Sequence, residues 1–114
     1  MADTRRNYTD KQLEDGRRKL AAFREWLRDN RRAYAFGECA AINALEAGQH
    51  TSGRAIVEHI RDNDTADRHG NKSRPNNDYA AIIARKFLRE HPQYAGRMKL
   101  RPCVFDVLMG GWHG

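Results

Sequence analysis

The segment between Pro75 and Pro92 constrains the fold more than any other part of the chain. It reads NNDYAAIIARKFLREH, in which apolar residues recur three and four positions apart, as on one side of a helix. Pro75 favours an extended residue before it, Asn76 or Asn77 can cap a helix, and Pro92 blocks its continuation. The sequence therefore predicts a helix over residues 78–91 with one broad apolar arc. The opposite, outer side of this helix is expected to carry Asp78, Ile82, Arg85 and Arg89.

The N-terminal part of the chain has a second well-marked helix. Thr9 and Gln12 have the spacing of a capping box, and the apolar residues that follow recur on one helical face. This pattern predicts a helix over about residues 10–29. Gly16 lies on the apolar face, which indicates close packing by another element.

Two further helices are expected before the central loop. Apolar residues from Ala35 to Leu45 have helical spacing, and Gly48 stands where a glycine commonly ends a helix. Thr51 or Ser52 can then cap a short third helix, which we expect to end near residue 62.

The rest of the chain is predicted to be loop and β-structure. Residues 62–76 are dense in turn formers, which predicts a loop or weak hairpin around residues 69–71. The alternation at residues 98–101 has strand period, and residues 103–108 are rich in β formers. We therefore expect one strand or a short hairpin, interrupted at Pro102.

Together these elements predict a mainly α fold, a small winged helix-turn-helix-like domain with about four helices and a C-terminal β-strand or hairpin. A chain of 114 residues with 32% charged residues fits one domain with a thin core. We expect a single domain over residues 1–114, with a basic N-terminal arm at 1–9, N-terminal helices at 10–47, a winged-helix-like core at 50–108 and a flexible tail at 109–114.

The charge distribution points to a polyanionic partner. The net charge is +6, and most of the basic residues are arginines, which suit bidentate contacts with phosphates. Both ends of the chain are basic and the middle is mildly acidic. This distribution favours a positive face over a uniformly charged tail.

The leading hypothesis is that the protein binds duplex DNA, as a regulatory or architectural protein. The predicted helix over 78–91 would enter the major groove as a recognition helix, its first residues would contact a phosphate, and the strand after it would form a basic wing. The same features also fit a solvated helix face, simple helix caps and a solvated strand edge. The candidate DNA-binding residues are Asn76, Asn77, Arg85, Arg89, Lys99 and Arg101.

The third and fourth predicted helices carry a family resemblance over residues 50–96. The segments TSGRAIVEHIRDN and NNDYAAIIARKFLREHPQYAG resemble a group of small proteins encoded by bacteriophages and prophages, a group without an established biochemical activity. The resemblance implies a phage origin. The matching positions are Ser52, Ala55, Ile56, Ile60, Arg61, Asn76, Asn77, Tyr79, Ala84, Arg85, Phe87, His91, Pro92 and Tyr94.

A rival hypothesis is a phage-encoded inhibitor or adaptor that binds a host protein, such as a defence or nucleic-acid-handling enzyme. Trp26 lies beside the apolar face of the first helix and could anchor an interface together with Arg28, Arg31 and Arg32. A half-buried core tryptophan is the alternative. The first helix could also pair with a copy of itself, which would make a homodimer.

Catalytic chemistry is not predicted. Cys39 and Cys103 lie outside any CxxC pattern and are expected to be buried free thiols, and no histidine has the spacing of a metal site or a catalytic triad. We expect no enzyme activity, no metal and no cofactor. The first ten residues lack an apolar signal segment and no run approaches a membrane span, which predicts a cytoplasmic protein without a membrane partner. The phage resemblance implies that this is the cytoplasm of a bacterial host.

Overall fold

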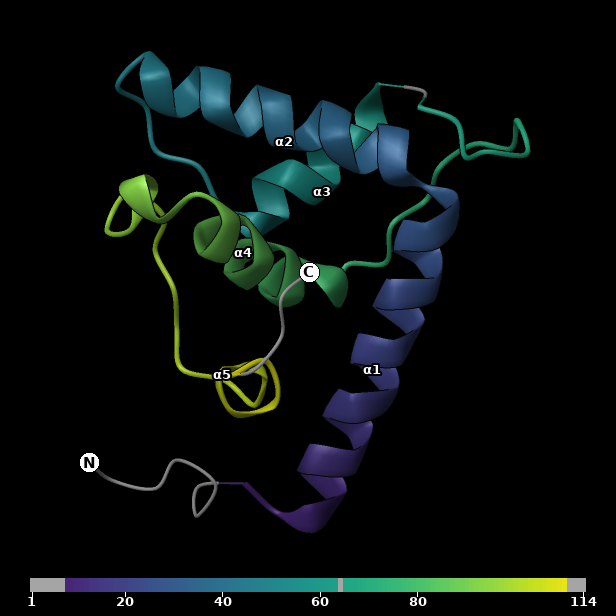
Figure 1. The fold of residues 1–114 in the computed structure, drawn as a ribbon, viewed down its shortest axis with the longest axis vertical. Coiled ribbons are helices and arrows are strands. Elements are labelled where there is room, and N and C mark those ends of the chain that lie inside the picture. The colour runs from purple at the N-terminus through teal and green to yellow at the C-terminus, as the bar shows by residue number, and fades with distance from the viewer. Residues whose placement is uncertain (1–7, 64, 111–114) are drawn as a thin grey trace.

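The computed structural model describes residues 8–63 and 65–110 of the chain, and this part is mainly helical (Figure 1). Two long helices come first, and three shorter ones and a 3₁₀ turn follow. They are α1 (Asp10–Asp29), α2 (Arg31–Glu46), α3 (Gly53–Asp62), α4 (Tyr79–Glu90), the 3₁₀ turn Pro92–Tyr94 and α5 (Phe105–Leu108). The mainly α prediction is therefore confirmed.

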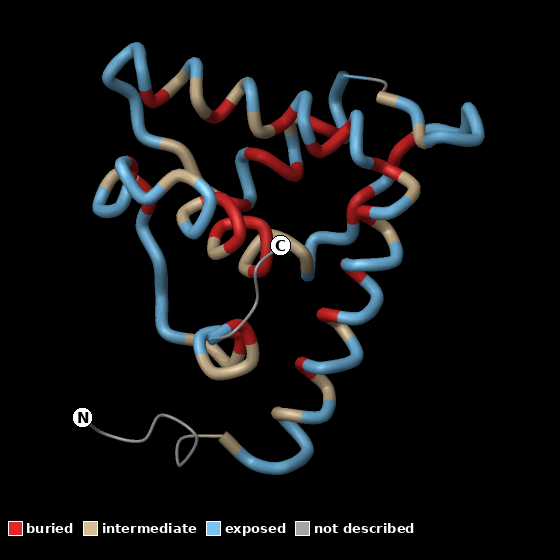
Figure 2. Tube along the Cα trace, viewed as in Figure 1, coloured by how far each residue is buried: buried red, intermediate tan, exposed pale blue. Residues whose placement is uncertain are grey.

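Helix α4 lies at the centre of the arrangement. It packs against α3, α1 and α5, while α3 is sandwiched between α4 and α2. Buried residues face one another across these contacts, and exposed residues follow the outer sides of α1 and α2 (Figure 2). The fully buried apolar side chains are Phe23, Val57, Ile60, Ile82, Ile83 and Phe87.

The predicted helix starts are confirmed at α1 and α3. At α1 the Gln12 backbone N–H donates to Thr9 Oγ1 over 3.1 Å, and Gln12 Oε1 accepts from the Thr9 backbone N–H over 2.8 Å, which completes the capping box. At α3 the hydroxyl of Ser52 accepts from the backbone N–H of Ala55 over 3.0 Å. Gly48, just after α2, has the positive φ of 82° that favours glycine.

The start of α4 differs from the prediction. Asp78, rather than an asparagine, occupies the cap position, and it makes no side-chain capping bond. Asn76 Oδ1 instead accepts from the Asp78 backbone N–H over 2.9 Å, so it shapes the turn before the helix. Asn77 Oδ1 accepts from Arg61 Nη1 over 2.6 Å, which ties this turn to the end of α3.

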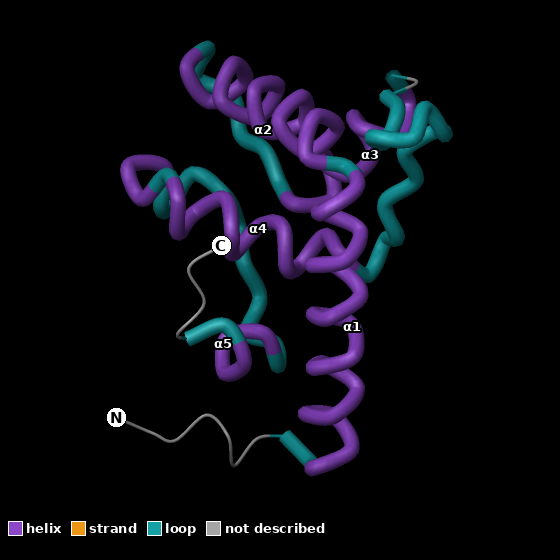
Figure 3. Tube along the Cα trace, turned by 45° about the vertical axis from the view of Figure 1, so that its right-hand side comes forward, coloured by secondary structure: helices purple, strands orange, loops and turns teal. Residues whose placement is uncertain are grey.

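The predicted C-terminal strand is wrong, and the described residues form no β-strand or wing (Figure 3). Residues 97–104 are a loop with a single bridge from Met98 to Thr51, and the apolar residues after it form α5. A strand needs a partner edge, and residues 8–63 and 65–110 form no strand that could supply one. Instead α5 packs on α1 at Gly16, as the close-packing prediction required: a Cβ at Gly16 would lie 2.7 Å from Leu108 Cδ1.

Other expectations have mixed outcomes. The central loop contains one antiparallel bridge, from Ala66 to Lys72, so the weak hairpin is present. Cys39 is exposed and Cys103 only partly buried, so the prediction of two buried thiols is wrong. Residues 1–7 of the predicted basic arm and 111–114 of the predicted flexible tail lie outside the described residues. Within the described ranges, no helix is both long and apolar enough to cross a bilayer.

Candidate nucleic-acid interface

Arg85 does not project from the domain as the sequence predicted. Its side chain is only 10% exposed, and Nε lies 2.7 Å from Asp106 Oδ1. Nη2 donates to the backbone carbonyl of Arg101 over 2.7 Å, and Nη1 donates to that of Ala81 over 3.0 Å. Arg85 therefore fastens the C-terminal segment to α4. To contact DNA it would first have to break these bonds.

The reason is that α4 has more than one buried side. The predicted arc left Ile82 on the outer side with Arg85, yet Ile82 is fully buried. A helix that packs against three others cannot be described by one apolar face.

The ion pair between Arg85 and Asp106 should make stability depend on acid pH. Burial raises the pKa of the Asp106 carboxyl, but hydrogen bonds from Arg85 and from the Cys103 backbone N–H outweigh it, so the pKa lies below its usual value. The contribution of this carboxylate is therefore complete above the unfolded-state pKa of about 3.9, and it is lost as the pH falls through the lower folded-state pKa.

We expect Asp106→Asn to lower the free energy of unfolding by about 1 kcal/mol at neutral pH, because the carboxylate is partly exposed. The variant should also lose less stability than wild type between neutral pH and about pH 3. Urea unfolding at the two pH values measures both effects. An equal acid dependence in the two proteins would contradict the assignment.

The other predicted DNA contacts are scattered. Lys99 and Arg101 are exposed on the loop before α5 and share a shallow hollow of about 250 Å³ with Arg85. Arg89 is exposed and its Nη2 lies 3.5 Å from the carbonyl of Gly110. The turn that carries Asn76 and Asn77 lies before the first residue of α4, at the other end of this helix from Arg89. The structure therefore brings Arg85, Lys99 and Arg101 together in one hollow, and the other three predicted residues do not line it.

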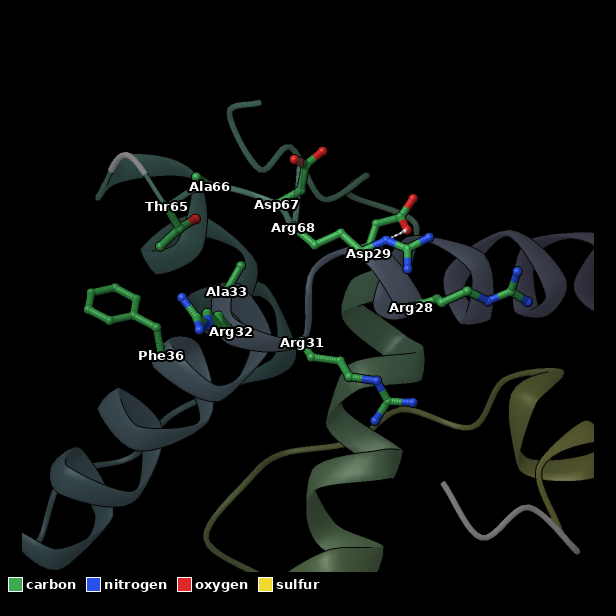
Figure 4. A pocket seen from close by; sticks show the side chains of 10 residues that line it. All are labelled: Arg28, Asp29, Arg31, Arg32, Ala33, Phe36, Thr65, Ala66, Asp67 and Arg68. Atoms are coloured by element: carbon green, nitrogen blue, oxygen red, sulfur yellow. Dashed lines mark ion pairs between the residues drawn. The ribbon is translucent and has the colours of Figure 1, made fainter. Parts of the chain in front are cut away.

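A larger pocket of about 700 Å³ lies where α1 turns into α2 (Figure 4). We call it the corner pocket. Its lining comes from the end of α1, the start of α2 and the loop after α3. These residues are Arg28, Asp29, Arg31, Arg32, Ala33, Phe36, Thr65, Ala66, Asp67 and Arg68.

A buried polar contact holds the loop against this corner. Asn30, the single residue between α1 and α2, is buried and donates from Nδ2 to the carbonyl of Trp26 over 2.8 Å. Its Oδ1 accepts a 2.5 Å hydrogen bond from the hydroxyl of Ser73, which is also buried. The backbone N–H of Arg68 donates to the carbonyl of Asp29 over 2.8 Å. The pocket is thus built by long-range contacts.

The two carboxylates of the pocket are already engaged within the protein. Asp29 Oδ1 lies 2.7 Å from Arg68 Nε, the ion pair drawn in Figure 4. Asp67 Oδ1 accepts from the backbone N–H groups of His69 and Asn71 over 2.9 and 3.0 Å, which closes the hairpin turn. Among the described contacts, neither acid therefore forms an ion pair with Arg28, Arg31 or Arg32.

Arg28, Arg31 and Arg32, which we call the arginine corner, are exposed and have no hydrogen bond or ion pair to any other residue that the structure describes. Arg31 and Arg32 also open α2, whose first turn has no acidic residue and no side-chain cap. The positive end of the helix dipole adds to their charge. With four arginines against two aspartates, the lining of the corner pocket carries a net charge of +2.

Figure 4 shows how these side chains lie. Arg32 extends on the same side of the corner as Phe36, whereas Arg28 and Arg31 extend to the other side. The positive charge is therefore spread across the corner rather than gathered at one point. An extended anion fits this layout better than one small ion does.

Trp26, the candidate interface anchor, is partly buried and packs against the core. Its ring centroid lies 6.1 Å from that of Phe23 and 5.9 Å from that of Tyr79. This position agrees with a half-buried core tryptophan, and its interface role stays a prediction. From the sequence, Arg28, Arg31 and Arg32 were predicted to form a possible protein interface with Trp26. Phe36 and Arg68 were not predicted, although RDNRR across a helix break is a visible basic cluster.

A second polar cluster joins α2 to the end of α4. Ligand-type atoms of Glu38, Glu90 and His91 lie within 4.8 Å of one another. His91 Nε2 is 2.9 Å from Glu38 Oε2, and Lys86 Nζ is 2.6 Å from Glu90 Oε2. Because the buried ammonium of Lys86 already neutralises Glu90, a metal ion would have to displace it. We therefore assign this cluster a structural role between helices.

Comparison with known proteins adds no assignment: no family model matches the chain, and no curated protein or solved structure is significantly similar to it. The phage resemblance accordingly stays a prediction. Function must be argued from the geometry of the site.

Proposed function

We propose that the protein binds nucleic acid and holds the phosphate backbone at the arginine corner. The observation that carries this proposal is the set of three exposed guanidinium groups that have no partner among the described residues. Guanidinium groups bind phosphates in a bidentate manner and are the side chains most often used for this purpose.

The position of these arginines is unfavourable without a ligand. Like charges close together repel, and basic residues at the start of a helix oppose the helix dipole. Arg31 and Arg32 have both disadvantages. A bound phosphate would remove both, since an anion is favoured at the positive end of a helix dipole.

This proposal keeps the nucleic-acid partner predicted from the sequence but moves the contact surface. The winged-helix version places Arg85 of α4 in the major groove, where its ion pair with Asp106 opposes it. A basic wing on Lys99 and Arg101 would need a strand that the described residues do not form. Contacts between backbone phosphates and the arginine corner need neither a free Arg85 nor a β-strand wing. Such contacts imply binding with little sequence preference.

Binding of a fluorescent duplex of arbitrary sequence across a salt series tests the proposal. We expect micromolar or tighter affinity at low salt. The logarithm of the binding constant should fall against the logarithm of salt concentration with a slope of roughly −3, since each phosphate contact contributes about −0.9. Absence of binding to duplex and to single strands at low salt would refute nucleic-acid binding.

Phe36 favours a second candidate function, the adaptor that binds a host protein. Its side chain is large, apolar and 40% exposed, and it adjoins the arginine corner in one pocket. Exposed aromatic residues beside arginines are typical of protein-binding hot spots. An acidic host protein that binds the arginine corner, in a chain that fails to bind nucleic acid, would favour this candidate.

A further inference from the structure

We infer that the nucleic acid bound at the arginine corner is single-stranded, and that one of its bases stacks on the ring of Phe36. This inference rests on the proposed function and specifies its ligand. It starts from an aromatic side chain that the core does not use.

The ring of Phe36 is both exposed and held in place. It projects from α2 and stacks on the imidazole of His59 in α3, with ring centroids 4.8 Å apart and planes inclined by 19°. Phe36 nevertheless remains 40% exposed as a residue, although the domain buries the other three phenylalanines. A fixed and exposed aromatic ring is a suitable platform for a planar ligand.

The platform adjoins the phosphate-binding groups. Phe36 lies one helical turn after Arg32, and both line the corner pocket. Phe36 also borders a second hollow of about 480 Å³, which His59 helps to line. Figure 4 places Arg32 on the same side of the corner as Phe36. A strand crossing the corner could therefore place its phosphates on arginines and a base on Phe36.

This combination distinguishes single strands from duplexes. In a duplex the bases are paired and stacked inside, so that a ring on the protein surface cannot reach their faces. In a single strand every base can turn outward, and stacking tolerates any sequence. The arginines alone would serve either form, but Phe36 serves only the unpaired one. Stacking on one aromatic ring should strengthen binding about tenfold.

The test compares three fluorescent ligands, a mixed-sequence single-stranded DNA, the same sequence as RNA, and the DNA duplex. Wild type should bind the single strands about tenfold more tightly than the duplex at equal salt. Phe36→Leu, which keeps an apolar side chain without a ring, should lose this advantage and leave duplex affinity unchanged. Leu100→Ala, at the other exposed large apolar residue of the described chain, is the matched control and should change neither affinity.

A direct readout of stacking accompanies the affinities. A 2-aminopurine base in the single strand should lose fluorescence on binding wild type, and much less on binding Phe36→Leu. The DNA and RNA arms show which strand is preferred. Equal affinity for duplex and single strands, with no effect of Phe36→Leu, would overturn this inference and leave the proposed function standing. Competition by polyglutamate as strong as that by the single strand would also overturn it.

Discussion

Gly53→Ala is expected to destabilise the domain by about 3 kcal/mol or more, because a side chain at this position has no space. A Cβ at Gly53 would lie 1.9 Å from the carbonyl oxygen of Ala80 and 2.8 Å from its carbonyl carbon. These are backbone atoms of α4, so no rotamer change can relieve the overlap. Helices α3 and α4 would have to move apart, and the core between them would lose its packing.

Urea unfolding followed by circular dichroism measures this loss. Gly110→Ala is the matched control: its Cβ would lie 3.6 Å from the nearest atom, an ordinary contact, and should change stability by no more than about 0.5 kcal/mol. Gly37→Ala should fall between the two, since its closest neighbours are methyl and methylene groups of Ile60 that can shift. Equal stability of Gly53→Ala and Gly110→Ala would show that α3 and α4 separate at little cost.

The helices could be predicted because their ends are marked locally. The capping box of Thr9 and Gln12 and the hydroxyl of Ser52 act within three residues, so the sequence alone locates them. The close approach of α3 to α4 at Gly53 could not be predicted. A glycine on an apolar face, such as Gly16, can indicate close packing, but the sequence does not show which residue of another helix comes nearest.

The C-terminal segment failed as a strand because local periodicity is ambiguous over a few residues. Val104 is a β former in isolation, but here Val104 and Leu108 pack closely over Gly16 on α1. Burial against another helix decided their conformation, as tertiary context commonly does for short segments. No strand partner was available among the described helices.

The site was predicted only in part for a similar reason. The helical wheel of α4 assumed one buried side, and Arg85 was therefore placed outside, where the fold instead provides Asp106 as its partner. The corner pocket depends on the hydrogen bond between Asn30 and Ser73, residues far apart in the sequence. Charge composition indicated arginines as candidate binding groups but could not show which of them lack partners.

Replacing Arg28, Arg31 and Arg32 together with glutamine should weaken nucleic-acid binding by about a hundredfold or more near 0.1 M salt. Loss of three phosphate contacts should also reduce the magnitude of the salt slope by about 2 to 3, with the smaller figure for single strands. Binding measured by fluorescence anisotropy across a salt series gives both quantities. The fold should be unaffected, because the three side chains make no hydrogen bond or ion pair within the described chain.

A second triple variant separates a local contact from a general effect of charge. Arg17, Lys99 and Arg101 are exposed and do not line the corner pocket, so replacing them with glutamine removes an equal amount of positive charge elsewhere. This variant should bind nucleic acid only modestly more weakly than wild type, since salt near 0.1 M screens charges beyond about 10 Å. If this variant instead loses binding and the corner variant retains it, the contact surface is the loop beside α4, where the wing was predicted. Equal small losses would mean that binding depends on net charge alone and that no specific corner site exists.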